Sequence, residues 1–149
     1  MNVVFIAPPA AGKGTQATLL RDNYNFYHIS TGDVLREIAE TNTPLGCEIK
    51  ALIDNGKLVS DELMAKLLKE KIGSLGNVEG IIFDGFPRTL EQAHMLDEIL
   101  NEVGMKVNKV IYFDIDKDTA MKRALGRVTC KDCGEIYNTY FDTFLKEDE

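Results

Sequence analysis

Residues 7–15, with the sequence APPAAGKGT, have the types and spacing best suited to chemistry. They follow an apolar run and precede a helical pattern, so they form a tight loop between a strand and a helix. Such a loop directs several backbone N–H groups and the positive end of the helix at one point, and Lys13 adds a full charge. The arrangement suits the β- and γ-phosphates of a nucleotide, so we expect phosphate contacts from Ala10, Ala11, Gly12, Lys13, Gly14 and Thr15.

The loop departs from the standard G-x-x-x-x-G-K-[ST] form at two alanines. Ala7 occupies the position of the first glycine, and Ala10 occupies another position where glycine would be easier. A residue other than glycine at positive φ carries strain of about 1 kcal/mol or more. The alternative interpretation is an alanine- and proline-rich turn with an exposed Lys13.

A second candidate site follows the apolar run over residues 80–84. Asp84 ends that run and leads into Gly85-Phe86-Pro87-Arg88. An acidic residue at the carboxyl end of a strand, near a phosphate loop, is placed to hold Mg²⁺ through water. Arg88 offers two parallel donors to a phosphate. The alternative is an ordinary loop with a surface arginine.

The elements that must position these residues alternate between strands and helices. Apolar runs predict strands over residues 2–6, 80–84 and 109–114, each covered on both faces, and a shorter strand over residues 27–29. Amphipathic patterns and caps predict helices over residues 13–23, 31–41, 45–54, 61–72, 90–103 and 117–126. This alternation predicts a doubly wound α/β fold with a parallel sheet.

Two stretches do not fit a simple alternation of strands and helices. Residues 30–59 are helical with no strand long enough for the sheet, which indicates an insertion. From Val128 onward the helical pattern gives way to a hairpin-like segment that carries Cys130 and Cys133.

Composition and charge exclude several classes of protein. The 149 residues carry a net charge of −7, which argues against non-specific binding of nucleic acid. No run approaches the roughly 18 apolar residues of a membrane span, and the N-terminus lacks the basic region of a signal peptide. Three cysteines without a secretion signal fit a reducing compartment, so we expect a cytoplasmic protein.

Three motifs together resemble the adenylate kinase family: Gly12-Lys13-Gly14-Thr15-Gln16, Ser30-Thr31-Gly32-Asp33 and Phe83-Asp84-Gly85-Phe86-Pro87-Arg88. The resemblance covers essentially the whole chain. It implies transfer of the γ-phosphoryl group from ATP to AMP, giving two ADP, with Mg²⁺ accompanying ATP. It also implies a three-layer P-loop NTPase-type core over residues 1–29 and 60–126, a helical AMP-binding insertion over residues 30–59, and part of a lid over residues 127–149.

The resemblance assigns AMP contacts by position. These are Thr31, Arg36, Lys57, Leu58, Val59, Gly85, Phe86, Pro87, Arg88 and Gln92, with Lys57-Leu58-Val59 closing over the adenine. Gln92 has a competing explanation, because Thr89-x-x-Gln92 is also a capping box. We favour the adenine contact.

The resemblance also assigns ATP contacts outside the phosphate loop. Arg123 and Arg127 are four residues apart on the last predicted helix, so they share one face and match arginines that bind the ATP phosphates. A solvated basic face is the alternative. Ile136 and Tyr137 resemble the lid segment that covers the ATP adenine. The implied catalytic residues are Lys13, Arg88, Arg123 and Arg127.

The Cys130-x-x-Cys133 pair is half of a zinc site, since structural zinc takes four ligands. We therefore expect Zn²⁺ only in a longer form of the chain. The family normally continues past residue 149 with the rest of the lid and further arginines, so we expect a fragment or a variant of reduced activity. The expected partners are ATP and AMP, without nucleic acid or membrane, and the chain is expected to be monomeric. The alternatives are a non-catalytic nucleotide-binding or interaction module, or a kinase for another nucleoside monophosphate.

Overall fold

A computed structural model describes residues 1–142 of the chain. These residues form two compact units. One comprises Met1–Ile6 and Gly14–Ile111, and the other comprises Ala7–Lys13 and the chain from Tyr112 onward. The predicted lid boundary at residue 127 therefore lies within the second unit, and the predicted lid residues 143–149 lie outside the described part of the chain.

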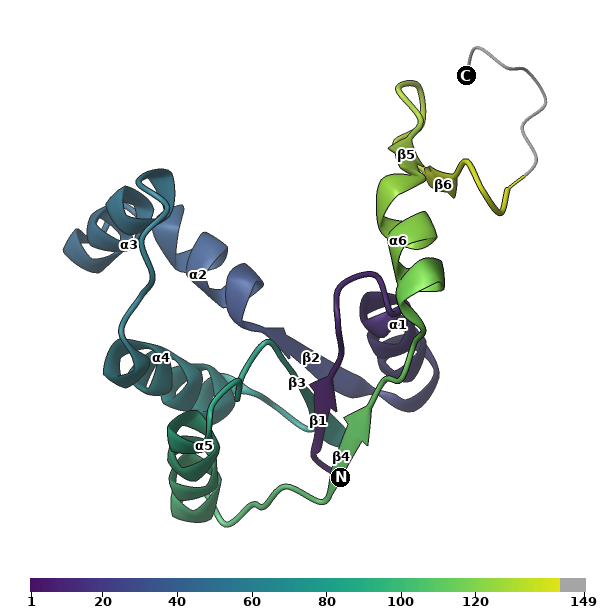
Figure 1. Ribbon diagram of the computed structural model, residues 1–149. Helices are drawn as coiled ribbons and strands as arrows, with labels where there is room; N and C mark the ends of the chain where they lie inside the picture. The colour runs from purple at the N-terminus through teal and green to yellow at the C-terminus, as the bar shows by residue number, and fades with distance from the viewer. Residues whose placement is uncertain (143–149) are drawn as a thin grey trace. The chain divides into compact units, whose positions relative to one another are not determined.

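The first unit is built on a sheet with the strand order β2-β3-β1-β4 (Figure 1). The strands are β1 (Val3–Ile6), β2 (Phe26–Ser30), β3 (Gly80–Asp84) and β4 (Lys109–Tyr112). Strands β1 and β2 both run parallel to β3, which lies between them. The predicted parallel α/β sheet is thus confirmed, and the short candidate strand over residues 27–29 is a full member of it.

In the described residues, all six predicted helices are present, and each begins and ends within two residues of its predicted bounds. They are α1 (Lys13–Tyr24), α2 (Thr31–Ala39), α3 (Pro44–Asp54), α4 (Asp61–Ser74), α5 (Leu90–Glu102) and α6 (Lys117–Leu125). The agreement follows from caps that the sequence shows. The side-chain oxygens of Thr43, Ser60, Thr89 and Asp116 each accept a hydrogen bond from a backbone N–H in the first turn of α3, α4, α5 and α6. Ser30, at the start of α2, makes no such bond.

The main hydrophobic core lies between one face of the sheet and helices α2 to α5. Because side chains alternate along a strand, Val4, Ile81 and Phe83 point into this core, whereas Ile82 points to the opposite face. The buried residues that form the core are Val4, Ile29, Val34, Ile49, Met64, Leu67, Leu68, Ile72, Ile81, Phe83, Phe86, Leu96, Ile99 and Leu100. Since α4 and α5 both pack into this core, the core holds the N-terminal turns of both helices in place.

Strand β4 does not match the expectation of burial on both faces. All four of its residues are exposed, with Val110 59% and Tyr112 66% accessible. Edge position alone does not explain this exposure, because β2 lies at the other edge of the sheet and its Phe26 and Ile29 are buried. Among the described residues, β4 contributes no side chain to the core between the sheet and helices α2 to α5. An apolar run predicts a strand, but it does not reveal whether other elements cover that strand.

The second unit contains helix α6 and a hairpin of two antiparallel strands, β5 (Arg127–Thr129) and β6 (Ile136–Asn138). The hairpin-like segment predicted after Val128 is confirmed. Helix α6 ends at Leu125, because the Asn138 side chain donates to the carbonyl oxygens of Lys122 and Arg123 at 3.3 and 3.0 Å. Arg127 therefore belongs to β5, and the prediction that it shares a helix face with Arg123 is wrong.

None of the helices in the described part of the chain is long and apolar enough to span a membrane.

Candidate phosphoryl-transfer site

The register of two neighbouring strands brings two predicted site segments together. Strands β2 and β3 are parallel, and Ser30 pairs with Asp84 at their carboxyl ends. The residues that directly follow these two strands are therefore Thr31, after β2, and Gly85, after β3. Strand β1 adds its own carboxyl end nearby, since Phe5 also pairs with Asp84. In open α/β sheets, ligands bind at this edge.

Gly85 is required by both its conformation and its surroundings. Its φ is +85°, which L side chains rarely adopt, and a Cβ atom here would lie 2.7 Å from Thr31 Oγ1 and 3.3 Å from Arg88 Nη2. Arg88 turns back on the same loop, because its Nε donates to the Gly85 carbonyl oxygen at 2.8 Å. The hydroxyl of Thr31 and the guanidinium of Arg88 thus both lie against Gly85.

Phe86 and Pro87 complete this loop in different ways. Phe86 is 3% exposed and belongs to the hydrophobic core, so its side chain anchors the loop to that core. Pro87 is half-buried, and the peptide bond before it is cis. The side chain of Phe86 is therefore not available to a ligand.

Gln92, in the first turn of α5, is held on both sides of its side-chain amide. Its Oε1 accepts from the backbone N–H of Arg88 at 2.7 Å, and its Nε2 donates to Asp61 Oδ1 at 2.8 Å. Its backbone N–H donates to Thr89 Oγ1 at 3.2 Å. One half of the capping box is therefore formed, but the returning bond reaches Arg88 rather than the backbone of Thr89. The adenine contact remains a prediction.

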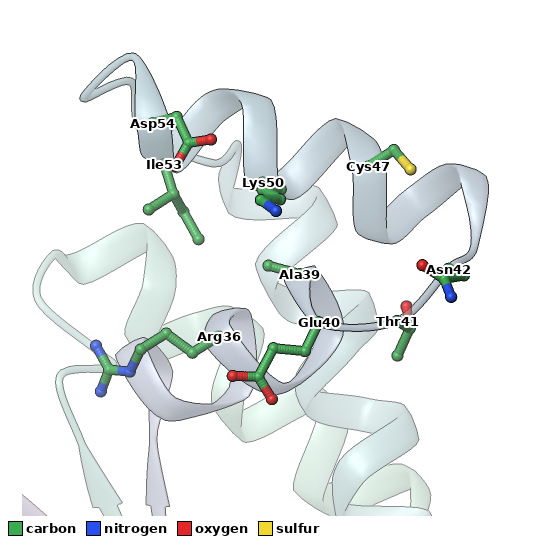
Figure 2. A pocket seen from close by; sticks show the side chains of 9 residues that line it. All are labelled: Arg36, Ala39, Glu40, Thr41, Asn42, Cys47, Lys50, Ile53 and Asp54. Carbon is green, nitrogen blue, oxygen red and sulfur yellow. The ribbon is translucent and has the colours of Figure 1, made fainter.

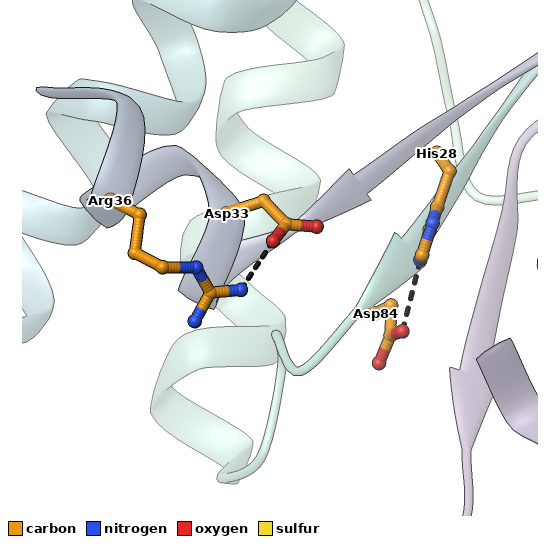
Figure 3. Close-up of polar contacts among 4 residues, drawn as sticks. All are labelled: His28, Asp33, Arg36 and Asp84. Carbon is orange, nitrogen blue, oxygen red and sulfur yellow. Dashed lines mark hydrogen bonds and ion pairs between the residues drawn. The ribbon is translucent and has the colours of Figure 1, made fainter. Parts of the chain in front are cut away.

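Asp84 and His28 form an ion pair or hydrogen bond beneath this edge (Figure 3). The distance from His28 Nε2 to Asp84 Oδ2 is 2.9 Å, and the side chains are 20% and 10% exposed. Mg²⁺ prefers carboxylate oxygens, waters and substrate phosphates, and it needs only one or two carboxylates from the protein. A single buried carboxylate at a strand end therefore fits a magnesium ion held through water.

Arg36 lies one turn of helix beyond Thr31 on α2 and pairs with Asp33 of the same helix (Figure 3). The two side chains are 66% and 58% exposed, so the pair contributes little to stability. The Arg36 guanidinium also lies over Gly32, where an added Cβ would be 3.2 Å from Nη1. An anion could therefore replace Asp33 as the partner of Arg36 at small cost.

A pocket of about 480 Å³ lies between α2 and α3 (Figure 2). Figure 2 shows Arg36 at one end of it and Asn42 with Cys47 at the other. Of the predicted AMP contacts only Arg36 lines it, so the pocket touches the candidate site at one corner. Its lining residues are Arg36, Ala39, Glu40, Thr41, Asn42, Cys47, Lys50, Ile53 and Asp54.

The predicted adenine-covering segment, residues 57–59, connects α3 to α4. Leu58 is 94% exposed, and the Lys57 backbone N–H donates to the carbonyl oxygen of Leu52 at 2.9 Å. The segment leads directly into Ser60 and Asp61, and Asp61 is bonded to Gln92. Asp61 and the hydrogen bonds of Gln92 thus link this loop to the turn that contains Arg88.

The phosphate loop itself lies in the second unit up to Lys13. Ala10 has a φ of +63° and Gly12 a φ of +87°, so both occupy the left-handed region. The predicted strain is confirmed for Ala10, but it is wrong for Ala7, which is absent from the positive-φ residues of the described chain. A Cβ atom at Gly12 would lie 3.9 Å from Arg123 Nη1, so the loop and Arg123 come together. Gly14 and Thr15 continue into α1.

Comparison with known proteins agrees with these motifs. A family model described as "Adenylate kinase" matches residues 5–149 of the chain. The chain belongs to the adenylate kinase family. It is 46% identical over 141 residues to an adenylate kinase of Rhizorhabdus wittichii, covering 95% of this chain and 66% of that protein. It is 44% identical over 147 residues to an adenylate kinase of Bacillus pumilus, covering 99% and 68%. The chain thus spans about two thirds of the length of the curated relatives it matches.

The lid residues that the adenylate kinase resemblance assigns to ATP lie in the β5–β6 hairpin. Arg127 pairs with Asn138, Val128 with Tyr137, and Thr129 with Ile136. The Tyr137 hydroxyl donates to Glu135 Oε2 at 3.0 Å, and this hydrogen bond raises the pKa of the phenol. Ile136 is 53% exposed, which leaves an apolar side chain for a base to contact.

Cys130 and Cys133 lie in the turn between β5 and β6. The Gly134 backbone N–H donates to the Cys130 carbonyl oxygen at 3.0 Å, which closes the turn around the two residues. Within residues 1–142, no group of three or more histidine, cysteine, aspartate or glutamate side chains could hold a metal ion. The two thiols therefore do not make a zinc site with the described residues, and zinc in a longer form remains a prediction.

Sequence reasoning missed three side chains that hold the predicted ones: His28, Asp33 and Asp61. His28 contacts Asp84 only because of the β2–β3 register, and Asp61 contacts Gln92 only because α4 packs beside α5. Neither relationship has a signal in the spacing along the chain. Asp33 could have been found, since an Asp and an Arg three residues apart on a helix commonly pair.

Proposed function

We propose that the chain binds ATP and AMP and transfers the γ-phosphoryl group of ATP to AMP, giving two ADP. The observation that carries the proposal is the convergence of Thr31, Gly85 and Arg88 at the carboxyl edge of the sheet. Thr31 and Arg88 offer a hydroxyl and a guanidinium, both held against Gly85, to one small anion. Family membership supports the same activity.

In the acceptor half of the site, Arg88 binds the phosphate of AMP through its two terminal nitrogens, and Arg36 binds it from α2. The Thr31 hydroxyl adds a hydrogen bond. Gly85 lets Thr31 and Arg88 lie side by side against the backbone, because any side chain there would meet Thr31. Lys57, Leu58 and Val59 cover the adenine, and Gln92 contacts its edge.

In the donor half, the phosphate loop and Lys13 bind the β- and γ-phosphates of ATP. Arg123 lies close to Gly12 and neutralises charge on the transferred group, together with Arg127. Phosphoryl transfer depends on positioning and charge neutralisation rather than on a covalent intermediate. Asp84 would hold Mg²⁺ through water, and the ion, when bound with ATP, would supply positive charge that neutralises the phosphates. We also propose that the enzyme is monomeric, that it is cytoplasmic and that it acts in nucleotide metabolism.

The test measures ADP formation from ATP and AMP with Mg²⁺ in a coupled assay. The Bacillus pumilus relative serves as the positive control, and UMP, CMP and GMP are compared with AMP as acceptors. We expect two ADP for each ATP consumed, with AMP as the best acceptor. Calorimetric titrations with ATP and AMP accompany the assay. Binding of both nucleotides without ADP formation would identify a non-catalytic nucleotide-binding module, and a better acceptor than AMP would identify a different nucleoside monophosphate kinase.

A further inference from the structure

The side-chain amide of Gln92 is held by two groups of fixed polarity. The backbone N–H of Arg88 can only donate, and it lies 2.7 Å from Oε1. The ionised carboxylate of Asp61 can only accept, and it lies 2.8 Å from Nε2. Rotating the amide by half a turn would set N–H against N–H and oxygen against carboxylate. The amide therefore has one stable orientation.

The groups that hold the amide are themselves rigid. Gln92 is in the first turn of α5, where its backbone N–H is bonded to Thr89. Asp61 is the first residue of α4, which begins at the Ser60 cap. Both helices pack into the same core through residues such as Leu68 and Leu100, which are fully buried. Neither partner can follow a rotation of the amide without disturbing that core.

Two bonding positions of the amide remain for a ligand. An amide carries two N–H donors and two acceptor positions, and the bonds to Asp61 and Arg88 use one of each. The remaining N–H and the remaining acceptor position have fixed places, because the amide cannot rotate. The side chain thus offers one defined donor–acceptor pattern.

The edges of the purine bases differ in this pattern. A 6-aminopurine presents a donor at its exocyclic amine and an acceptor at N1, whereas a 6-oxopurine presents an acceptor at O6 and a donor at N1. A freely rotating amide could pair with either base, but a fixed amide pairs with only one. Sites that leave polar groups unpaired reject the wrong base strongly.

We propose that Asp61 sets the base specificity of the monophosphate site by fixing the orientation of the Gln92 amide. The proposal rests on the proposed function, in which Gln92 contacts the base of AMP. With Asp61 in place the site accepts a 6-aminopurine and rejects a 6-oxopurine. Asp61 acts through Gln92 and is a positioning residue.

The variant that tests this role is Asp61→Asn. An asparagine has almost the same shape, but its side chain can either accept or donate, so it no longer forbids the rotated amide. The wild-type orientation also remains possible, so AMP binding should be retained. In this variant, rotation of the Gln92 amide loses one hydrogen bond instead of two. We therefore expect the ratio of the IMP to the AMP dissociation constant to fall about fivefold, which corresponds to one net hydrogen bond. AMP and IMP are the suitable pair because they differ only at position 6 and N1 of the base.

Two further variants separate base reading from a structural effect. Glu62→Gln removes the same charge from the same turn of α4, and Glu62 is exposed, so the ratio should stay at the wild-type value. Gln92→Met removes the amide, and in that background Asp61→Asn should no longer change the ratio. Calorimetric titration of AMP and of IMP at neutral pH gives the two dissociation constants for each variant, and thermal unfolding shows whether each variant is folded.

The outcomes distinguish this inference from the proposed function. A wild-type chain that binds no AMP would overturn the proposed function, and the inference with it. AMP binding by the wild type, with the same IMP-to-AMP ratio in Asp61→Asn as in Glu62→Gln, would overturn only the inference. Equal weakening of AMP and IMP together with a lower unfolding temperature would do the same, because it would show that Asp61 is a structural tie between α4 and α5.

Discussion

The imidazole Nε2 of His28 lies 2.9 Å from the Oδ2 of Asp84, although the two residues are 56 positions apart in the chain (Figure 3). The contact arises because β2 and β3 are parallel and His28 pairs with Ile82, two residues before Asp84 on the same strand. His28 thereby fixes one carboxylate oxygen of a residue that is 8% exposed. This contact orients the whole carboxylate group.

We expect His28→Leu to weaken the binding of Mg²⁺ in the presence of ATP. Losing the imidazole leaves the Asp84 carboxylate without this hydrogen bond, so the carboxylate is held less firmly in the orientation that suits the ion. The Mg²⁺ concentration for half-maximal ADP formation should rise about fivefold, the factor of one hydrogen bond. Binding of Mn²⁺ in the presence of ATP, followed by electron paramagnetic resonance, should weaken in parallel.

His28→Gln is the matched control for this prediction, because a glutamine amide can donate to Asp84 from a similar position. It should restore metal binding close to the wild-type value. His94→Gln, in an exposed position on α5, should change nothing. Equal losses in His28→Leu and His28→Gln would show that the imidazole acts through packing and not through its hydrogen bond.

Ala10→Gly should be better tolerated than Ala7→Gly. Ala10 has a φ of +63°, and glycine there removes strain of about 1 kcal/mol, which offsets the entropic cost of about 0.5–1 kcal/mol that glycine brings. Ala7 has no positive φ to relieve, so Ala7→Gly should lower the free energy of unfolding by that full cost. Urea unfolding of the two variants measures the difference. ATP titration should show tighter binding only for Ala10→Gly, and equal results for both variants would contradict the assignment of strain to Ala10.

Much of the fold followed from the sequence because its signals are local. The six helices are bounded by caps and glycines that act within a few residues, such as Thr43 at the start of α3 and Gly56 after its end. Whether other elements cover a strand is not local, so the exposure of β4 was not foreseen. The end of α6 is not local either, since the capping amide comes from Asn138, the last residue of β6. The same distinction applies to the site. Motifs gave Thr31, Gly85 and Arg88, whereas His28 and Asp61 depend on register and helix packing.

Gly85→Ala should damage both the fold and the acceptor site. The residue has a φ of +85°, and the new Cβ would lie 2.7 Å from Thr31 Oγ1, so the backbone or Thr31 must move. Strain of this kind costs about 1–3 kcal/mol in the free energy of unfolding. AMP affinity should fall as well, because Thr31 and Arg88 are displaced together. Chemical unfolding and AMP titration measure the two effects.

Gly73→Ala provides the opposite control within the same unit. Gly73 is in α4 with no atom within 4 Å of its ideal Cβ, so alanine should raise stability by about 0.5–1 kcal/mol and leave AMP binding unchanged. If Gly85→Ala were as well tolerated as Gly73→Ala, the close approach of Thr31 to Gly85 would not be required for folding or binding.

Arg88→Ala should weaken AMP binding far more than ATP binding. The guanidinium is held by the Gly85 carbonyl at 2.8 Å and lies beside Thr31, on the acceptor side of the proposed site. Charge-assisted hydrogen bonds to a phosphate contribute about 1.5–3 kcal/mol, so AMP affinity should fall about tenfold to a hundredfold. Arg88→Lys should recover little of it, because an ammonium cannot make two parallel bonds. Arg21→Ala, at an exposed residue paired with Asp22, is the control for loss of charge. Equal loss of both nucleotides would mean that Arg88 lies between the two sites.

Lys13→Met should abolish productive ATP binding and leave the fold intact. Lys13 is the first residue of α1, directly after Gly12 with its φ of +87°, so its charge adds to the backbone N–H groups of the loop. Methionine keeps the length and apolar part of the side chain, so the unfolding temperature should not change. Titration with ATP should show the loss, while AMP affinity should stay at the wild-type value. Lys66→Met, at an exposed position of α4, removes a charge without touching either site. Wild-type ATP affinity in the Lys13→Met chain would refute the phosphate-loop assignment and, with it, the donor half of the proposed reaction.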